Sequence, residues 1–257
     1  MGESVFLADI SWTEFARRIA KGAIVFVPIG ATEQHGRHMP LGVDVTIPMA
    51  ISVDVARQSG GLVAPPIAYG NRSQPRSGGG RDFPGTINIA ATTFSWLLRD
   101  ILTELFRHGA RKIVIVNGHY ENVWPSIEAI ELALEHIGRD RAGTLKVLRV
   151  DHWELVTPAT LARVFPDGYP GIELEHASVI ETSIMLALRP DLVDLAQAAN
   201  DGPARFKPYD RFPGPVSEVP PSGVLSLTEG SSAEKGQWLL NDAIAGLKRA
   251  IAEEFGQ

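Results

Sequence analysis

Short apolar runs alternate along the chain with longer segments in which apolar residues recur every three or four positions. The runs at residues 23–29 and 112–116 are rich in β-branched residues, which predicts buried strands. Between them, residues 93–108 have the apolar period of an amphipathic helix, and Gly109 follows as its C-cap. A helix of this length between two strands is typical of the right-handed crossover that joins parallel strands.

The same alternation continues with a helical segment at residues 122–137 and a further strand at residues 145–150, which leads to His152 and Trp153. Residues 62–68 form another extended segment. Its Pro-Pro pair places it at a sheet edge or a strand end, because proline cannot donate to a strand ladder. The pattern predicts an α/β fold, a layered sandwich around a mostly parallel central sheet.

The last third of the chain contains two further helical segments separated by a proline-rich stretch. A helix-like run begins at His176 and stops before Pro190, and the last helix begins near Ser231, where Ser231 and Glu234 have capping-box spacing. Residues 202–223, between them, contain six prolines. The remaining chain is too short for an independent domain, so we expect one domain over residues 1–257, with 202–223 as an ordered arm, a lid or a subunit contact.

Composition restricts the possible functions. The 257 residues, 44% of them hydrophobic, are enough to bury one large core. With 24 basic and 30 acidic residues the net charge is -6, and without a basic stripe we expect no nucleic-acid partner. The lack of cysteine excludes disulfides, thiolate zinc sites and a cysteine nucleophile. No signal peptide or membrane-spanning run is visible, so we expect a cytoplasmic protein without a membrane partner.

Two pairs of metal-ligand residues follow two of the predicted strands. Glu33 with His35, and His119 with Glu121, are each two residues apart, so each pair points the same way on an extended segment. In open α/β sheets, ligands bind at the carboxyl ends of the strands. Asp44, the lone acid in GVDVTIP, is the natural bridge between two ions held by imidazole and carboxylate. The pattern predicts a binuclear metal centre, and therefore a metallohydrolase.

The motifs ATEQHGRHMPLGVDV, SGGGRDFPGT and VNGHYEN resemble those of the creatininase family (creatinine amidohydrolases). The resemblance continues through HWELV, ELEHASVIETSIMLALRPDLVDL, PYDRFP and the C-terminal helix, so it covers nearly the whole chain. It implies a creatininase-like layered fold with a metal site at the carboxyl ends of the strands. It also implies zinc or manganese as the two divalent ions of each chain, and a homo-oligomer such as a hexamer.

The resemblance also implies how the ligands are shared. Glu33 and His119 would bind one ion, His35 and Glu121 the other, and Asp44 would bridge them. The remaining candidate histidines match no ligand position: His38, His108, His136 and His152.

Catalysis is assigned to His176, Glu175 and Glu121. His176 resembles the proton-shuttling histidine of the family, and imidazole has a pKa suited to that task. Glu175 is expected to orient His176 or to assist it, while Glu121 also binds metal. Between two cations, water becomes a nucleophile near neutral pH and the substrate carbonyl is polarised, so the expected reaction is hydrolytic opening of a cyclic amide.

The expected substrate is a small molecule held by Ser77, Tyr120, Trp153 and Ile172. Tyr120 and Trp153 resemble pocket-lining residues, since a flat cationic or amidine-like ring packs well on aromatic faces. Ser77 begins a glycine-rich loop that lets backbone approach a small substrate. Creatininases carry a second tryptophan upstream of the shuttle histidine, where this chain has Ile172, so one stacking surface is lost and the substrate is left open.

Three functional hypotheses follow. The first is hydrolysis of creatinine to creatine. The second is hydrolysis of another lactam or of a formamide by a related enzyme. The third, of a different class, is a non-catalytic oligomeric metal-binding scaffold, which the joint presence of His176 and all five ligand positions disfavours.

Overall fold

The computed structural model describes residues 4–212 and 218–256, and these form a four-stranded sheet in the order β2-β1-β3-β4. All three pairings are parallel. The strands are β1 (Val25–Ile29), β2 (Leu62–Val63), β3 (Lys112–Asn117) and β4 (Lys146–Asp151). The apolar runs therefore form the predicted parallel sheet, and the segment with the Pro-Pro pair contributes its short edge strand.

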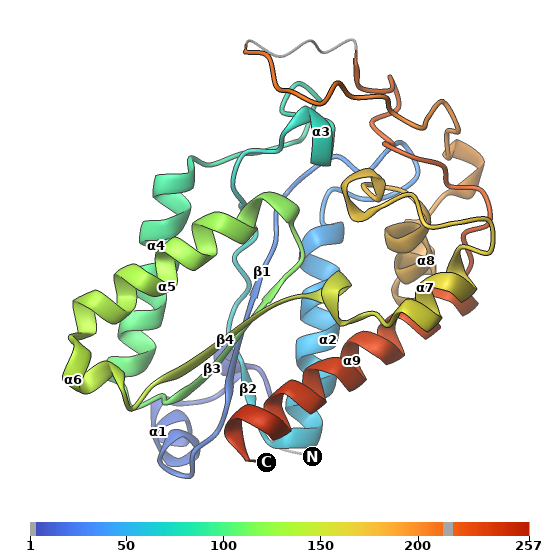
Figure 1. Ribbon diagram of the computed structural model, residues 1–257. Helices are drawn as coiled ribbons and strands as arrows, with labels where there is room; N and C mark the ends of the chain where they lie inside the picture. The colour runs from blue at the N-terminus through green and yellow to red at the C-terminus, as the bar shows by residue number, and fades with distance from the viewer. Residues whose placement is uncertain (1–3, 213–217, 257) are drawn as a thin grey trace.

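Helices cover both faces of this sheet (Figure 1). On one face lie α1 (Trp12–Ala20), α4 (Ala91–Arg107) and α5 (Val123–Ile137), and on the other lie α2 (Val43–Ser59), α8 (Val179–Leu188) and α9 (Ala233–Phe255). Alternate residues of a strand point to opposite faces, so Phe26 packs in the core of α2, α8 and α9 while Val25 and Val27 pack in that of α4 and α5. This confirms the layered α/β sandwich.

Shorter elements connect these layers. Among the described residues they are α3 (Pro75–Gly78), α6 (Arg139–Ala142), α7 (Pro158–Val164) and the 3-10 turns η1 (Leu7–Asp9), η2 (Tyr120–Asn122), η3 (His152–Leu155), η4 (Ile172–Leu174), η5 (Pro190–Leu192) and η6 (Leu195–Gln197). Four of them, α3, η2, η3 and η4, carry residues predicted to bind substrate. Among the described residues, every helix is too short or too polar to cross a bilayer.

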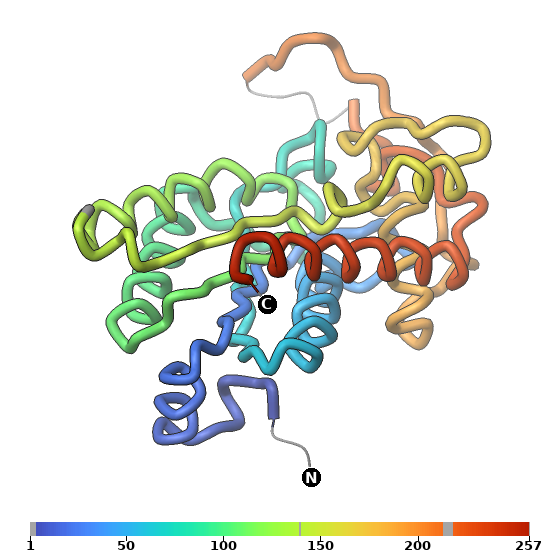
Figure 2. Tube along the Cα trace, turned by 60° about the horizontal axis from the view of Figure 1, so that its bottom comes forward, coloured from blue at the N-terminus to red at the C-terminus, as the bar shows by residue number. Residues whose placement is uncertain are grey.

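The helix α2 is an element that the periodicity does not predict. It packs against β1, β2 and β3, Figure 2 shows it beside α9, and its buried residues recur in pairs every four positions from Val43 and Asp44 onward. Its less buried side also carries apolar residues, including Val45 and Met49, so apolar and polar positions do not separate into an amphipathic period. Pro48 in its interior adds a helix-breaking signal. For both reasons the sequence pattern does not predict this helix, which carries Asp44 in its first turn.

Two predicted helix starts are wrong by a few residues. The N-cap of α9 is Ser232, whose hydroxyl accepts the N–H of Lys235 at 3.2 Å, so the predicted capping box at Ser231 is displaced by one residue. The helix expected from His176 begins only at Val179, because the backbone at Ala177 is left-handed with φ 55°. The predicted helices at residues 93–108 and 122–137 are confirmed with small shifts of their ends.

The proline-rich stretch is described on both sides of residues 213–217, which lie outside the described residues. Its first part is joined to the following segment by the Ala204 N–H, which donates to the Leu225 carbonyl at 2.7 Å. Ala204, Val219 and Leu225 form a small separate core with Phe83, Leu174 and Phe206. The described part is therefore an arm packed on neighbouring loops, and its role as a lid stays a prediction.

Candidate metal centre

The predicted ligands gather where β1 and β3 end, and Asp44 lies between the two histidines. His35 Nε2 is 2.9 Å from Asp44 Oδ1, and His119 Nδ1 is 3.1 Å from Asp44 Oδ2. His119 Nδ1 is also 3.1 Å from Glu33 Oε2. These four side chains are at most 2% exposed. Because each oxygen of Asp44 faces a different imidazole, its carboxylate has the arrangement of a bridge.

Hydrogen bonds fix the orientation of both imidazoles. His35 Nδ1 lies 3.1 Å from the Glu33 carbonyl and His119 Nε2 lies 2.9 Å from the Asn71 carbonyl, so in each ring this nitrogen is the donor. In the neutral form that binds a metal, the opposite nitrogen of each ring would direct its lone pair toward Asp44. Such outer hydrogen bonds are typical of metal-binding histidines.

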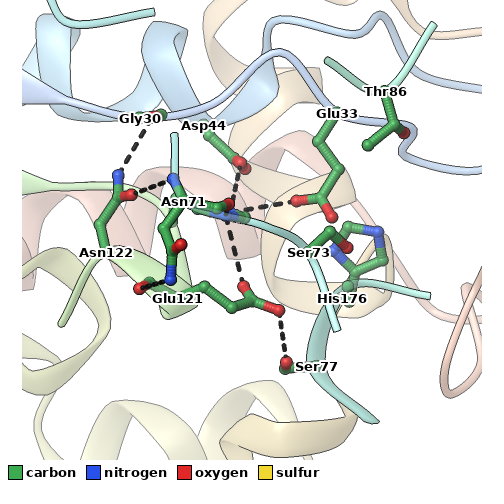
Figure 3. Close-up of polar contacts among 12 residues, drawn as sticks. Gly30, Glu33, Asp44, Asn71, Ser73, Ser77, Thr86, Glu121, Asn122 and His176 are labelled. Carbon is green, nitrogen blue, oxygen red and sulfur yellow. Dashed lines mark hydrogen bonds and ion pairs between the residues drawn. The ribbon is translucent and has the colours of Figure 1, made fainter. Parts of the chain in front are cut away.

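Glu121 and Glu181 complete the cluster from opposite sides. Glu121 Oε2 is 3.4 Å from His119 Nε2, and Glu121 Oε1 accepts hydrogen bonds from the Ser77 hydroxyl and the Gln74 N–H, both at 2.6 Å. Figure 3 shows the carboxylates of Glu33, Asp44 and Glu121 converging from three sides. Glu181, from the first turn of α8, has Oε2 3.5 Å from His35 Nε2.

The ligand atoms fall into three groups whose members lie within 4.8 Å of one another. They are Glu33 with Asp44 and His119, His35 with Asp44 and Glu181, and Glu33 with His35 and His176. The first group contains the ligands predicted for one ion. In the second group Glu181 lies beside His35, where Glu121 was expected. The sharing of an ion by Glu121 and His35 therefore stays a prediction. The sequence signal for Glu181 is the one that identifies Asp44, a lone acid in a short apolar stretch.

The site fits cations because several of its polar atoms are buried without a hydrogen-bond partner in the described part of the chain. These atoms are Glu33 Oε1 and, apart from the close approaches to other ligands of the cluster given above, His35 Nε2, Asp44 Oδ2 and Glu121 Oε2. Buried polar atoms are normally satisfied, and unpaired ones indicate a missing ion or water. A donor set of imidazole nitrogen and carboxylate oxygen without sulfur suits zinc and manganese.

The electric field of the site favours positive charge. Burial alone would raise the pKa of Asp44, but the neighbouring His35 and His119 hold it well below its usual range. Burial disfavours charged imidazoles, yet the carboxylates around them raise the pKa of His35 and His119 well above the usual value. Burial raises the pKa of Glu33 to about 7, even though His119 opposes this. Without ions, the site therefore holds protons in their place.

His176 and Glu175 have opposite protonation preferences beside this cluster. The His176 ring centroid is 4.5 Å from that of His35, and burial together with His35 moves the pKa of His176 well below its usual value. His176 is therefore a neutral imidazole that can accept a proton. Glu175 Oε2 accepts the Ile180 N–H at 2.9 Å, and burial raises the pKa of Glu175 to about 8, so this carboxyl group is protonated near neutral pH.

A small cavity opens over the cluster. It is lined by all four predicted substrate-binding residues and by both of the groups just described, namely Ser77, Tyr120, Trp153, Ile172, Glu175 and His176. The rings of Tyr120 and Trp153 are stacked, with centroids 6.2 Å apart and an interplanar angle of 28°. A flat polar ring can pack against such an aromatic pair while it faces the cluster.

Several supporting residues were not identified from the sequence. The Gln34 Nε2 atom lies 2.8 Å from His176 Nε2 and donates to the carbonyls of Gly78 and Gly223. At Gly78 a Cβ atom would lie 2.2 Å from Glu33 Oε1, so this glycine lets the loop approach a ligand as well as a substrate. These residues have no ligand-type pattern in the chain, and only the tertiary contacts reveal them.

Of the four histidines that match no ligand position, two are exposed and two are buried. His108 and His136 are exposed. His38 is buried with Nε2 2.9 Å from the Thr182 hydroxyl, and His152 is buried with its ring centroid 5.1 Å from that of Trp153. Burial lowers the pKa of both buried histidines to about 4. They support the site as neutral groups.

Comparison with known proteins gives one consistent result. The family model described as creatinine amidohydrolase matches residues 8–251. The chain is 43% identical over 257 residues to the creatinine amidohydrolase of Pseudomonas putida, covering 99% of each chain. It is 33% identical over 232 residues to a mycofactocin precursor peptide peptidase of Mycolicibacterium smegmatis, covering 87% of this chain and 82% of that one.

The solved structures agree in fold along the whole chain. A crystal structure of creatinine amidohydrolase matches with a TM-score of 0.97 at 42% identity, and 100% of both chains is covered. A glutamate-to-glutamine variant of creatininase complexed with creatine matches with a TM-score of 0.96 at 42% identity, covering 99% of this chain and 100% of that one. Creatininases described as manganese and Zn-Zn forms also match with a TM-score of 0.96.

Proposed function

The chain belongs to the creatininase family, and from this membership we propose that it is a binuclear metal-dependent amidohydrolase that opens creatinine to creatine. The observation that carries the proposal is the Asp44 carboxylate, whose two oxygens face His35 and His119 below a cavity lined by an aromatic pair. The cavity, the catalytic candidates and the ligands occur together, which disfavours a non-catalytic scaffold.

We assign one ion to Glu33, Asp44 and His119, and the other to Asp44, His35 and a further carboxylate. Two divalent ions bound there supply Lewis acids that polarise an amide carbonyl and lower the pKa of water. Zinc and manganese fit the donor set, and both occur in the creatininase structures that this chain resembles.

The protein groups bind the substrate and move its protons. Tyr120 and Trp153 hold the flat ring against their faces, and Ile172 covers part of the cavity. His176, held neutral by its buried position, accepts a proton from the attacking water and returns it to the ring nitrogen that leaves. Glu175, protonated near neutral pH, is a second proton donor at the cavity wall.

Glu121 links the metal side of the cavity to its substrate side. Its carboxylate contacts His119 and accepts hydrogen bonds from Ser77 and Gln74, which begin the glycine-rich loop. We infer that Glu121 keeps this loop in place while its unpaired oxygen faces the cluster. Ser77 then acts on the substrate mainly through the position of the loop.

A second candidate function is hydrolysis of another lactam, a formamide or a related amide. Ile172, rather than an aromatic residue, stands at the cavity wall and offers no stacking face. The relative of Mycolicibacterium smegmatis, at 33% identity, is described as a peptidase, so this fold is used by proteins that act on other amide bonds. Turnover measurements decide between the two candidates.

The test is creatine release from creatinine by protein loaded with zinc or manganese, beside a panel of lactams and formamides. We expect turnover of creatinine and a loss of about 100-fold or more in kcat for His176→Ala, in line with removal of a proton-transfer group. His136→Ala, which removes an exposed histidine, is the matched control and should keep full activity. Turnover of another amide without any creatine release would favour the second candidate.

We also propose that residues 1–257 form one domain that assembles as a homo-oligomer, with a hexamer as the expected state. Exposed apolar side chains on α4 and α5, including Trp96 and Trp124, support a subunit contact on that face. Light scattering of the purified protein gives the subunit number. The cytoplasmic location expected from the sequence remains part of this proposal.

A further inference from the structure

The residue after His176 has an unusual backbone conformation. Among the described residues, Ala177 is the single residue other than glycine whose φ is positive, at 55°. It is also fully buried. Residues with a Cβ atom rarely adopt this region, and they keep it only where their surroundings hold it. His176 directly precedes this turn, and its Nε2 atom lies 2.9 Å from the Gln34 carbonyl.

Glu181 holds the turn from the first turn of α8. The Ala177 N–H donates to Glu181 Oε2 at 2.6 Å, which is a short, charge-assisted hydrogen bond. On the carbonyl side of the turn, the His176 oxygen accepts the Ser178 hydroxyl at 3.0 Å and the Leu225 N–H at 3.2 Å. The carboxylate of Glu181 is therefore the charged member of the contacts that fix this backbone.

The same oxygen of Glu181 also faces the metal cluster. Glu181 Oε2 is 3.5 Å from His35 Nε2, the nitrogen that lies 2.9 Å from Asp44 Oδ1. Glu181, His35 and Asp44 form one of the groups whose ligand atoms lie within 4.8 Å of one another. One carboxylate thus contacts both the backbone that aims His176 and the half of the cluster at His35.

We propose that Glu181 is a positioning residue that binds the ion beside His35 and at the same time holds the left-handed turn that aims His176 at the cavity. The proposal rests on the proposed function, because it takes His176 as the proton-transferring group. Its consequence is that loading of this ion and placement of His176 are linked through one side chain.

A merely structural role has a different signature. Glu181 is the third residue of α8, where a glutamate commonly accepts an N–H of the preceding segment and caps the helix. Loss of a cap lowers stability but leaves metal stoichiometry and the state of the His176 ring unchanged. Two readouts that do not depend on turnover therefore separate the roles: metal ions per chain, and the ¹⁵N signals of His176 in histidine-labelled protein.

The experiment compares zinc-loaded Glu181→Gln, Glu181→Ala and the double variant Glu181→Ala with Ala177→Gly. Glutamine keeps an oxygen for the Ala177 N–H but loses the charge, so we expect at least about tenfold weaker binding of one ion and, once zinc saturates both sites, His176 signals like those of the wild type. Alanine loses both contacts, so binding should weaken and the His176 signals should differ even when zinc saturates both sites. Glycine adopts positive φ freely, so Ala177→Gly should restore the His176 signals of the saturated protein without restoring the affinity.

Glu173→Ala, which removes an exposed acid from the preceding turn, is the control and should change neither readout. Two tightly bound ions in both Glu181 variants would refute the metal contact. Unchanged His176 signals in Glu181→Ala, or no restoration by glycine, would refute the positioning role.

If Glu181→Ala does not fold, the conservative Glu181→Gln variant still tests the metal contact, and Ala177→Gly in that variant must leave the His176 signals unchanged. Creatine release, measured separately, tests the proposed function.

Discussion

Asp44 and Glu175 are both buried carboxyl groups, yet their surroundings move their pKa values in opposite directions. Asp44 faces two imidazoles, which lower its pKa, so it stays ionised. Burial raises the pKa of Glu175 to about 8, and the neighbouring Glu181 adds to this, although the hydrogen bond from the Ile180 N–H opposes it. The sequence identifies both as candidates from their spacing and resemblance. It cannot give the sign of either shift, because the partners of each carboxyl come from segments far away along the chain.

The pKa of Glu175 predicts a pH dependence of stability. The folded protein keeps this proton up to about pH 8, whereas an unfolded chain loses it near the ordinary value of 4.5. The folded state therefore binds more protons between these values, and this group's contribution to stability falls as the pH rises from 4.5 to 8. Glutamine cannot ionise and keeps an oxygen for the Ile180 N–H, so Glu175→Gln should gain thermal stability over the wild type as the pH rises.

Melting temperatures of metal-free protein at pH 5 and pH 9 measure this effect. The difference between Glu175→Gln and the wild type should be larger at pH 9. Glu154→Gln, at an exposed position nearby, should show the same difference at both values. An equal difference for Glu175→Gln at both pH values would mean that this carboxyl is ionised in the folded protein.

The bridging position of Asp44 predicts a loss of metal. Asp44→Ala removes the carboxylate that lies between both imidazoles, so we expect at most one ion per chain instead of two. Elemental analysis of dialysed protein gives the count. Asp54→Ala, on the same helix, should keep two ions. Two tightly bound ions in Asp44→Ala would exclude Asp44 as the bridge.

At the scale of elements, the site depends on how closely α2 approaches the strand ends. Pro48 lacks the N–H that would otherwise bond to the Asp44 carbonyl within the helix. That carbonyl instead lies against Gly30 and Gly118, where a Cβ atom would come within 2.3 Å and 2.2 Å of it. The strands and the glycines are visible in the sequence, but the contact between them and an unpredicted helix is not.

Gly118→Ala tests this approach. The added methyl group collides with backbone, which cannot move aside as a flexible side chain can, so we expect a loss of about 1–3 kcal/mol in the free energy of unfolding and weaker metal binding. Urea unfolding and metal titration measure the two effects. Gly143→Ala is the control, since nothing lies within 4 Å of a Cβ atom there. Equal effects of the two substitutions would show that the approach is not tight.

At the scale of the whole molecule, the cavity is assembled from segments far apart in the chain. The loops after β1 and β3, the start of α2, the glycine-rich loop and the segment before α8 each contribute lining residues. The described part of the proline-rich arm packs on two of these loops through Phe83 and Leu174. Metal ions bound at the centre therefore hold several segments together at once.

Removal of metal should lower the stability of the whole protein. Ions that bind only the folded state stabilise it by about 2.7 kcal/mol at a free concentration of 100 times Kd, so a chelator should lower Tm and added zinc or manganese should restore it. Differential scanning calorimetry measures the shift. In Asp44→Ala the chelator should lower Tm by less. An identical shift in that variant would place the stabilising ions elsewhere.

By itself the sequence determined the parallel α/β sandwich, the positions of the ligand pairs and the family, because strand periodicity and short motifs are local properties of the chain. Only the tertiary structure decided which oxygen of Asp44 faces which imidazole, that Glu181 joins His35, and that His176 is neutral while Glu175 holds a proton. These features depend on which distant residue faces each buried atom. Burial and neighbouring charge, rather than residue type, set the chemistry of those atoms.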